Sequence, residues 1–127
     1  MAVSEHFKHH ELVCRCGCGR NEMDENFLEM LEDLRAWVGK PIKLSSAFRC
    51  PEYNNKISAT GQSGPHTTGL AVDIQVYGVD AYDFIYGAFR VGFTGIGIKQ
   101  KGSLGGRFIH LDYLAEPDYP RPRVWTY

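Results

Sequence analysis

Two stretches of the sequence carry apolar residues at the three- and four-residue spacing of an amphipathic helix. The first predicts a helix from Asp24 to Val38, with the Asp24 side chain as N-cap and Gly39 just past the end. The second predicts a helix from about Asp80 to Val91, capped by Asp80 and stopped by Gly92. These are the two main helices expected, because residues 51–64 are polar and allow only a short one.

Short apolar runs bounded by glycine, proline or polar residues are typical of strands. We expect strands at residues 42–48, 70–76, 94–99 and 107–113, and an edge strand at 124–127. The other segments are expected to be irregular: the Cys-containing segment 1–23, the loop 61–69, the turn 102–106 and the Pro-rich tail 115–127. Because helices and strands mix without regular alternation, the sequence predicts an α+β fold. We expect one small domain over residues 1–127, with a mostly antiparallel central sheet and two main helices.

Composition places the chain among ordinary globular proteins. Of its 127 residues, 43% are hydrophobic and 23% are charged, and the formal net charge is −1. That charge argues against a nucleic-acid binder, and no apolar run reaches the roughly 18 residues that a membrane span needs. Residues 1–11 are polar and lack the apolar stretch of a signal peptide. We therefore expect a monomer without nucleic-acid or membrane partners, made in the cytoplasm without a leader.

Three of the four cysteines lie within five residues, at Cys14, Cys16 and Cys18, and the fourth is Cys50. This is not the two-pair spacing of a zinc ribbon. If this segment is extended, the first three sulfurs lie on one side, because alternate residues of an extended segment point the same way. A disulfide from one of them to Cys50, a structural metal and reduced thiols all remain as alternatives.

Histidine and aspartate occur together at two places. His66 in a loop is followed by Asp73 in a strand, and His110 and Asp112 share one face of another strand, about 6.5 Å apart along it. Two histidines and one carboxylate can hold a catalytic zinc, which keeps a fourth position for water and activates it for attack on an amide. The alternative is that the histidines are hydrogen-bonded core residues. A carboxylate buried at Asp73 needs a partner or a metal in either case.

Several motifs resemble those of a known peptidase family. SGPHTTGLAVD at 63–73 and the strand motif HLD at 110–112 are similar to zinc peptidases grouped with D-alanyl-D-alanine carboxypeptidases and phage-type L-alanyl-D-glutamate endopeptidases. That group shares its fold with the signalling domain of hedgehog proteins. LSSAFR at 44–49 and GIGI at 95–98 also fit, while HFKHHELVCRCGCG at 6–19 and CPEYN at 50–54 resemble a compact bacterial and phage subgroup. The resemblance covers residues 6–113.

The resemblance implies roles for individual residues. One catalytic Zn²⁺ would be held by His66, Asp73 and His110. Arg49 would point into the site and stabilise the oxyanion, as a permanently charged donor can. Ser46 and Ser63 would orient the substrate or the groups behind the metal ligands, or would serve simply as strand-end and turn hydroxyls.

Two positions depart from the family pattern. The smaller departure is Gly64, two residues before His66, where a serine is common; the other lies near the second histidine. Many members carry glutamate or aspartate three residues before the last zinc histidine, where it acts as the general base. This chain has Arg107 there, which cannot accept a proton. Asp112, on the same face as His110, is the nearest substitute, so we expect it to be the catalytic base. The alternative role of Asp112 is to orient a ligand histidine.

These features predict a zinc-dependent peptidase that hydrolyses peptide bonds in the stem or cross-link peptides of bacterial peptidoglycan, in the manner of a phage endolysin. Such a protein would act on the cell wall after lysis or as a virion component. Two alternatives stay open. A D-Ala-D-Ala carboxypeptidase would need a pocket for a free carboxylate, and a further cationic residue near Arg49 would favour this activity. A non-catalytic, zinc-stabilised binding or structural module would fit the missing acid at position 107.

Overall fold

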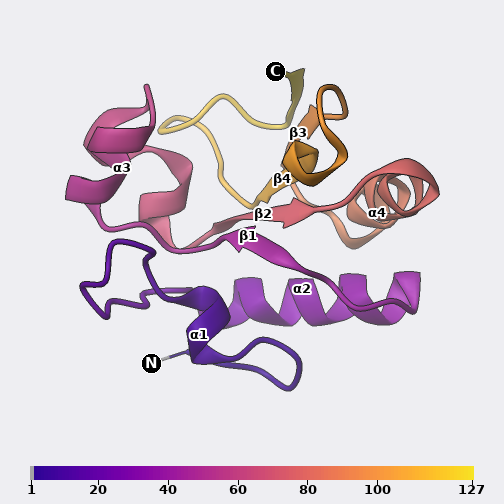
Figure 1. Cartoon of the computed structure of the whole chain (residues 1–127), viewed down its shortest axis with the longest axis horizontal. Coiled ribbons are helices and arrows are strands. Elements are labelled where there is room, and N and C mark those ends of the chain that lie inside the picture. The colour runs from indigo at the N-terminus through magenta and orange to yellow at the C-terminus, as the bar shows by residue number, and fades with distance from the viewer. Residues whose placement is uncertain (1) are drawn as a thin grey trace.

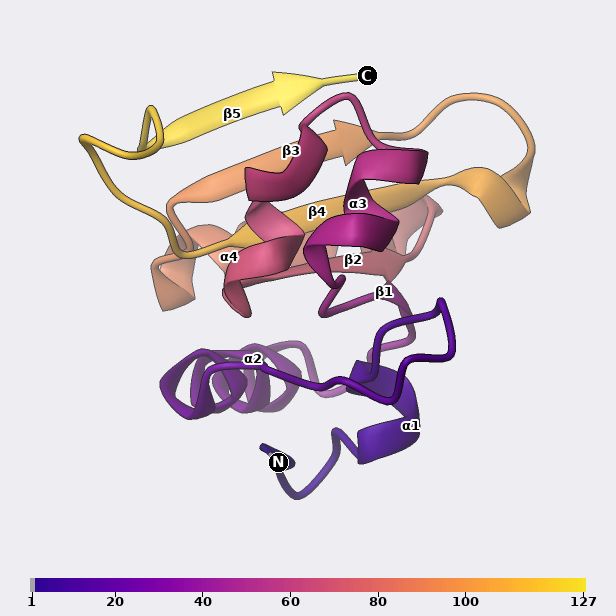
Figure 2. The same ribbon diagram turned by 90° about the vertical axis from the view of Figure 1, so that its left-hand side faces the viewer.

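The computed structural model describes residues 2–127, which fold around a five-stranded sheet (Figures 1 and 2). The strands are β1 (Leu44–Ser46), β2 (Ala71–Gln75), β3 (Gly95–Lys99), β4 (Phe108–Asp112) and β5 (Arg123–Thr126). Their order across the sheet is β1-β2-β4-β3-β5. All neighbours are antiparallel except β3 and β5, which are parallel. The predicted α+β fold with a mostly antiparallel sheet is confirmed.

Four α-helices and three short 3₁₀ turns complete the described chain. They are α1 (His9–Leu12), α2 (Glu25–Val38), α3 (Pro51–Ile57), α4 (Gly78–Val91), η1 (Gly61–Ser63), η2 (Pro65–Thr68) and η3 (Leu104–Gly106). The predicted start of α2 is confirmed, because the Asp24 carboxylate accepts a hydrogen bond from the Phe27 N–H at 2.9 Å. The predicted cap of α4 at Asp80 is wrong: the helix begins at Gly78, and the Asp80 carboxylate instead pairs with Lys40.

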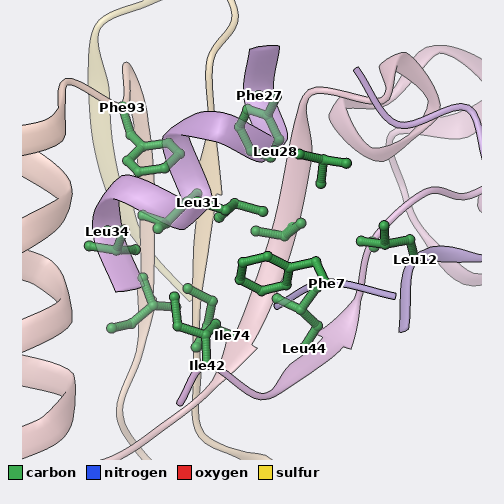
Figure 3. Close-up of a cluster of buried hydrophobic side chains, with 14 of the residues drawn as sticks. Phe7, Leu12, Phe27, Leu28, Leu31, Leu34, Ile42, Leu44, Ile74 and Phe93 are labelled. Carbon is green, nitrogen blue, oxygen red and sulfur yellow. The ribbon is translucent and has the colours of Figure 1, made fainter. Parts of the chain in front are cut away.

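One face of the sheet is apolar and packs against helices α1, α2 and α4. Strand residues on this face alternate with polar ones, so Val72, Ile74, Ile109 and Leu111 are fully buried. They meet the apolar stripe of α2 and the N-terminal segment in one core, shown in Figure 3, which includes Phe7, Leu12, Phe27, Leu28, Leu31, Leu34, Leu44 and Phe93. Burial of this stripe is what fixes the register of the strands, since a one-residue slip would turn the core side chains outward.

The opposite face carries a polar row that crosses the strands. The register places Ser46 opposite Asp73, Asp73 opposite His110, and His110 opposite Gly97. Asp112 is likewise opposite Gly95 on β3. A side chain at Gly95 would overlap the Asp112 carboxylate, and a Cβ at Gly97 would lie 2.6 Å from the Trp125 indole. The two glycines of β3 therefore leave room for polar and aromatic groups on this face.

Three segments differ from the sequence expectations. The predicted strand 42–48 shortens to β1, because Phe48 leaves the sheet and its N–H bonds the Leu12 carbonyl at 3.3 Å. The segment 1–23 was expected to be irregular, yet it contains the one-turn helix α1 and contributes Phe7 and Leu12 to the core. The edge strand predicted at 124–127 is β5, displaced by one residue. Within residues 2–127, no helix is long and apolar enough to cross a membrane.

Candidate metal centre

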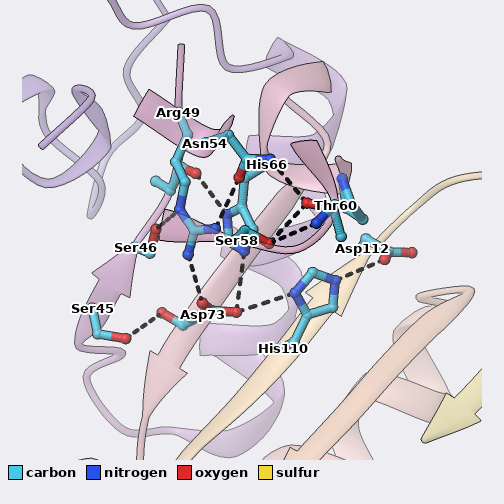
Figure 4. Close-up of polar contacts among 12 residues, drawn as sticks. Ser45, Ser46, Arg49, Asn54, Ser58, Thr60, His66, Asp73, His110 and Asp112 are labelled. Atoms are coloured by element: carbon cyan, nitrogen blue, oxygen red, sulfur yellow. Dashed lines mark hydrogen bonds and ion pairs between the residues drawn. The ribbon is translucent and has the colours of Figure 1, made fainter. Parts of the chain in front are cut away.

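Three buried side chains from separate elements meet on the polar face of the sheet (Figure 4). Asp73 of β2 and His110 of β4 are directly opposite each other in the antiparallel ladder. His66 comes from η2, the short turn that precedes β2. Each of the three residues offers one ligand atom, and these atoms all lie within 4.8 Å of one another. The structure thus brings together the three residues predicted as metal ligands.

The His66 ring is oriented by the backbone. Its Nδ1 lies 2.8 Å from the carbonyl oxygen of Ala47, where it can only donate a hydrogen bond. Nδ1 therefore carries a proton, and Nε2, which lies 3.3 Å from Oδ1 of Asp73, is the ring nitrogen that faces the other candidate ligands. A metal-binding histidine commonly donates its other ring nitrogen to a backbone carbonyl in this way.

The His110 ring is oriented by a carboxylate. Its Nε2 lies 2.7 Å from Oδ2 of Asp112, and its Nδ1 lies 3.1 Å from Oδ1 of Asp73. If Nε2 donates to Asp112, the Nδ1 lone pair faces the same point as His66 and Asp73. In this arrangement a carboxylate behind the histidine accepts its ring proton, which makes the imidazole a better ligand for the metal.

The spacing of these donor atoms fits zinc. Zinc–nitrogen and zinc–oxygen bonds of about 2.0–2.1 Å in a tetrahedron place neighbouring donor atoms roughly 3.3 Å apart. The distances from Asp73 Oδ1 to His66 Nε2 and His110 Nδ1 are 3.3 Å and 3.1 Å. Two imidazoles and one carboxylate also leave a fourth position open, as catalytic zinc sites do.

Charges around the site favour an ionised Asp73. Burial raises the pKa of Asp73, but His66 and His110 beside it more than offset this effect and hold its pKa below the ordinary value. Burial lowers the pKa of His110, while its contacts with Asp112 and Asp73 raise it to a net value above the ordinary one. A proton therefore competes with a metal for His110, and metal binding must displace it.

Asp112 is completely buried and both of its oxygens are engaged. Arg121 donates to it through two nitrogens, from Nε to Oδ1 at 2.9 Å and from Nη2 to Oδ2 at 2.8 Å. Burial raises the pKa of Asp112, but Arg121 and His110 together hold it below its ordinary value. Of the two roles that the sequence left open for Asp112, catalytic base or orienting group, this geometry favours the orienting one.

Arg49 faces the metal centre from the end of β1. Its Nε donates to the Ser46 hydroxyl at 3.1 Å and its Nη1 donates to the Asn54 side-chain oxygen at 3.0 Å. Its Nη2 lies 3.5 Å from Oδ2 of Asp73. Ser46 and Asn54 therefore hold the guanidinium in place, with one edge turned toward the ligand carboxylate (Figure 4).

A cleft of about 330 Å³ opens over this centre. Its walls combine the three candidate ligands with cationic, hydroxyl and aromatic side chains, including Arg49, Arg121, Arg123, Ser58, Thr60, Trp125 and Tyr127. The Trp125 ring lies 5.2 Å from the His110 ring, and the Arg123 guanidinium lies 5.3 Å above Trp125. The C-terminal strand β5 thus supplies one wall of the cleft.

Two residues considered from the sequence lie away from the ligands. Ser63 is exposed, and within residues 2–127 the lining of the cleft does not include it; its carbonyl oxygen accepts from the Tyr119 hydroxyl. Arg107 donates to the Gly102 carbonyl.

Sequence reasoning missed Asn54 and Arg121 as supporting residues. The CPEYN motif could have drawn attention to Asn54, whereas nothing in the Pro-rich tail marks Arg121.

The four cysteines form a second group. Cys14 and Cys50 are buried, Cys16 and Cys18 are exposed, and all four are free thiols. Residues 14–18 are not extended, because Cys16 lies in a turn and Gly17 has a φ of 90°. The sulfurs nevertheless gather, and all four Sγ atoms lie within 4.8 Å of one another.

Comparison with known proteins agrees with the motifs. The sequence model of a family described as Peptidase M15 matches residues 5–112, which include all three candidate ligands, Arg49 and Asp112. No curated protein matches the chain.

Proposed function

The chain belongs to the M15 peptidase family, whose members are zinc metallopeptidases, and from this premise we propose that it hydrolyses peptide bonds in bacterial peptidoglycan. The observation that carries the proposal is the buried set of His66, Asp73 and His110 at the floor of a cleft. In this proposal these three residues hold one zinc ion. When bound, the ion supplies Lewis-acid activation of water and of the scissile carbonyl.

The protein residues divide the remaining work. Arg49, held by Ser46 and Asn54, is placed to donate to the oxygen that becomes negative as the amide is attacked. Asp112 keeps the His110 ring in the tautomer that leaves Nδ1 free. Arg121 in turn keeps Asp112 ionised. We therefore assign Asp112 as a positioning residue.

The character of the cleft supports a wall peptide as the substrate. Stem peptides carry free carboxylates at D-glutamate and at their C-terminal end, so they are anionic ligands. Arg49 and Arg123 line the cleft together with the candidate ligands, and Trp125 and Tyr127 add flat aromatic surfaces to its walls. An arginine guanidinium can donate two parallel hydrogen bonds to a carboxylate, so these arginines suit an anionic peptide. The endolysin-like role and the action on walls after lysis remain predictions of the sequence.

One observation favours the carboxypeptidase alternative. Removal of a terminal D-alanine requires recognition of a free carboxylate close to the reacting bond. The sequence alone placed no second cation near Arg49, whereas the structure brings exposed Arg123 of β5 to the same cleft. Arg123→Gln should then raise KM for a substrate with a free C-terminus more than for one with an amidated C-terminus.

Digestion of purified peptidoglycan tests the proposal. The zinc-loaded protein is compared with His66→Ala, and with His10→Ala as a control that removes an exposed histidine of α1. We expect release of defined fragments by the parent and by His10→Ala and none by His66→Ala. Fragment masses distinguish free D-alanine from longer peptides. If the zinc-loaded parent releases nothing from walls of several chemotypes, the enzymatic proposal fails, and a zinc-stabilised module becomes the better explanation.

A further inference from the structure

The second group of potential metal ligands consists of Cys14, Cys16, Cys18 and Cys50, and the proposed hydrolysis does not use it. The loop that follows α1 brings the first three to the start of α3, where Cys50 lies (Figures 1 and 2). Cys14 and Cys50 are thirty-six positions apart, yet the Cys50 N–H donates to the Cys14 sulfur at 3.3 Å. The four thiols are the only cysteines of the chain.

The sulfur positions match a tetrahedral ion. Zinc–sulfur bonds of about 2.3 Å in a tetrahedron place neighbouring sulfurs roughly 3.8 Å apart. Cys16 Sγ lies 3.5 Å from Cys14 Sγ and 3.7 Å from Cys50 Sγ. A disulfide would use two of the four sulfurs and give no reason for the other two to converge on the same point. Four converging thiols instead fit a single shared ion, and thiolates are soft ligands that zinc accepts readily.

The surrounding backbone prepares the site. The Cys14 N–H bonds the Arg20 carbonyl at 2.8 Å, which closes the loop, and Gly17 takes the left-handed conformation that the turn needs. The N–H of Cys50 that points at Cys14 Sγ would stabilise a thiolate there. Four thiolates and one divalent ion carry a net charge of −2. In the sequence, Arg15 lies between Cys14 and Cys16, and Arg20 follows Cys18 after one glycine.

We propose that these cysteines bind a second, structural zinc ion. Four thiolates complete the tetrahedron, so the ion has no open position for water or substrate. Cys50 directly follows Arg49, and the neighbouring Phe48 N–H bonds Leu12 of α1. The ion therefore fastens the N-terminal segment to the junction between β1 and α3 that presents Arg49 to the cleft. This inference is independent of the reaction at the first site.

Metal counting on the full chain, purified under reducing conditions with zinc, tests the proposal. We expect two zinc ions per chain in the parent, one in His66→Ala and one in the double variant Cys16→Ser/Cys18→Ser. Cobalt substitution separates the two sites, because a thiolate-to-cobalt absorption band in the near ultraviolet can arise only from cysteine. The band should be present in the parent and in His66→Ala and absent from the double variant, whose thermal unfolding midpoint should fall.

Three results would contradict a structural zinc ion at the four cysteines. One zinc ion in the parent and none in His66→Ala would leave the cysteines without metal. So would free alkylation of all four thiols in the folded, zinc-loaded protein, or disulfides in the freshly purified protein. If the double variant does not fold, His66→Ala alone still decides, since it must retain one zinc ion and the cobalt band.

Discussion

Replacement of Asp112 by asparagine separates the two roles considered for this residue. Asparagine keeps the size of the side chain but removes the charge that faces His110 Nε2 at 2.7 Å and the Arg121 fork at 2.8–2.9 Å. Loss of a carboxylate behind a ligand histidine costs about 10–100-fold in metal affinity, or roughly 1.4–2.7 kcal/mol. We therefore expect the Kd for zinc at the His66–Asp73–His110 site to rise by this factor.

The same substitution leaves Arg121 without its buried partner. Breaking a buried ion pair from one side costs about 3–5 kcal/mol, so Asp112→Asn should also lower the free energy of unfolding. The double variant Asp112→Asn/Arg121→Gln removes both charges and should recover much of that stability without recovering zinc affinity. Asp118→Asn provides a matched control, because it changes an exposed carboxylate in the same part of the chain.

The assay is competition for zinc with a chelator of known affinity, run beside peptide release at saturating zinc. An orienting role predicts weaker zinc binding in Asp112→Asn and activity that returns substantially once zinc saturates the site. Unchanged zinc affinity together with loss of turnover at full occupancy would refute this reasoning and make Asp112 the proton acceptor instead.

Three further substitutions test other parts of the structure. Gly95→Ala should weaken zinc binding, because the added Cβ overlaps the Asp112 carboxylate. Gly105→Ala should not, because the nearest atom to its added Cβ is the Gln75 side-chain nitrogen at 4.0 Å, and chelator competition compares the two variants. Leu31→Ala empties part of the fully buried core and should lower the free energy of unfolding by about 3 kcal/mol in urea titrations, and a loss below 1 kcal/mol would contradict the packing. Glu32→Gln should destabilise the protein by about 1 kcal/mol at pH 7. Burial raises the pKa of Glu32, but hydrogen bonds from Ser4 and His6 bring it below the ordinary value. Its contribution is therefore present above the unfolded pKa of about 4.3 and is lost as the pH falls through the folded pKa. The unfolding midpoints of parent and Glu32→Gln should therefore approach each other as the pH falls below the unfolded pKa of about 4.3, and a constant gap would contradict this origin.

Much of the site was predictable because short-range patterns determine it. The alternation of apolar and polar residues in LAVDIQV and FIHLD places Asp73 and His110 on the face opposite the core, whatever the partner strands are. Once the two strands pair, their side chains must meet. The helix α2 was predictable for a similar reason, since its N-cap, its apolar stripe and its terminal glycine are all local signals.

The unpredicted features depend on contacts between distant segments. Arg121 lies in a tail with no periodic pattern. Its contact with Asp112 could not be predicted, because it depends on the parallel pairing of β5 with β3. Aspartate is a common N-cap residue, which is why Asp80 was predicted as the cap. Helix α4 already begins at Gly78, however, and the Asp80 carboxylate forms an ion pair with Lys40. The cysteines converge because the chain turns at Gly17, and the sequence alone did not indicate which way this irregular segment would turn.

Removal and return of zinc tests whether peptide hydrolysis depends on the metal. The purified protein is stripped with a chelator, its residual zinc is measured, and peptide release from peptidoglycan is followed as zinc or, in parallel, magnesium is added back. The account predicts that release falls to background in the stripped protein and returns with zinc but not with magnesium, since imidazole ligands suit zinc. Continued release from protein with no measurable zinc would contradict it.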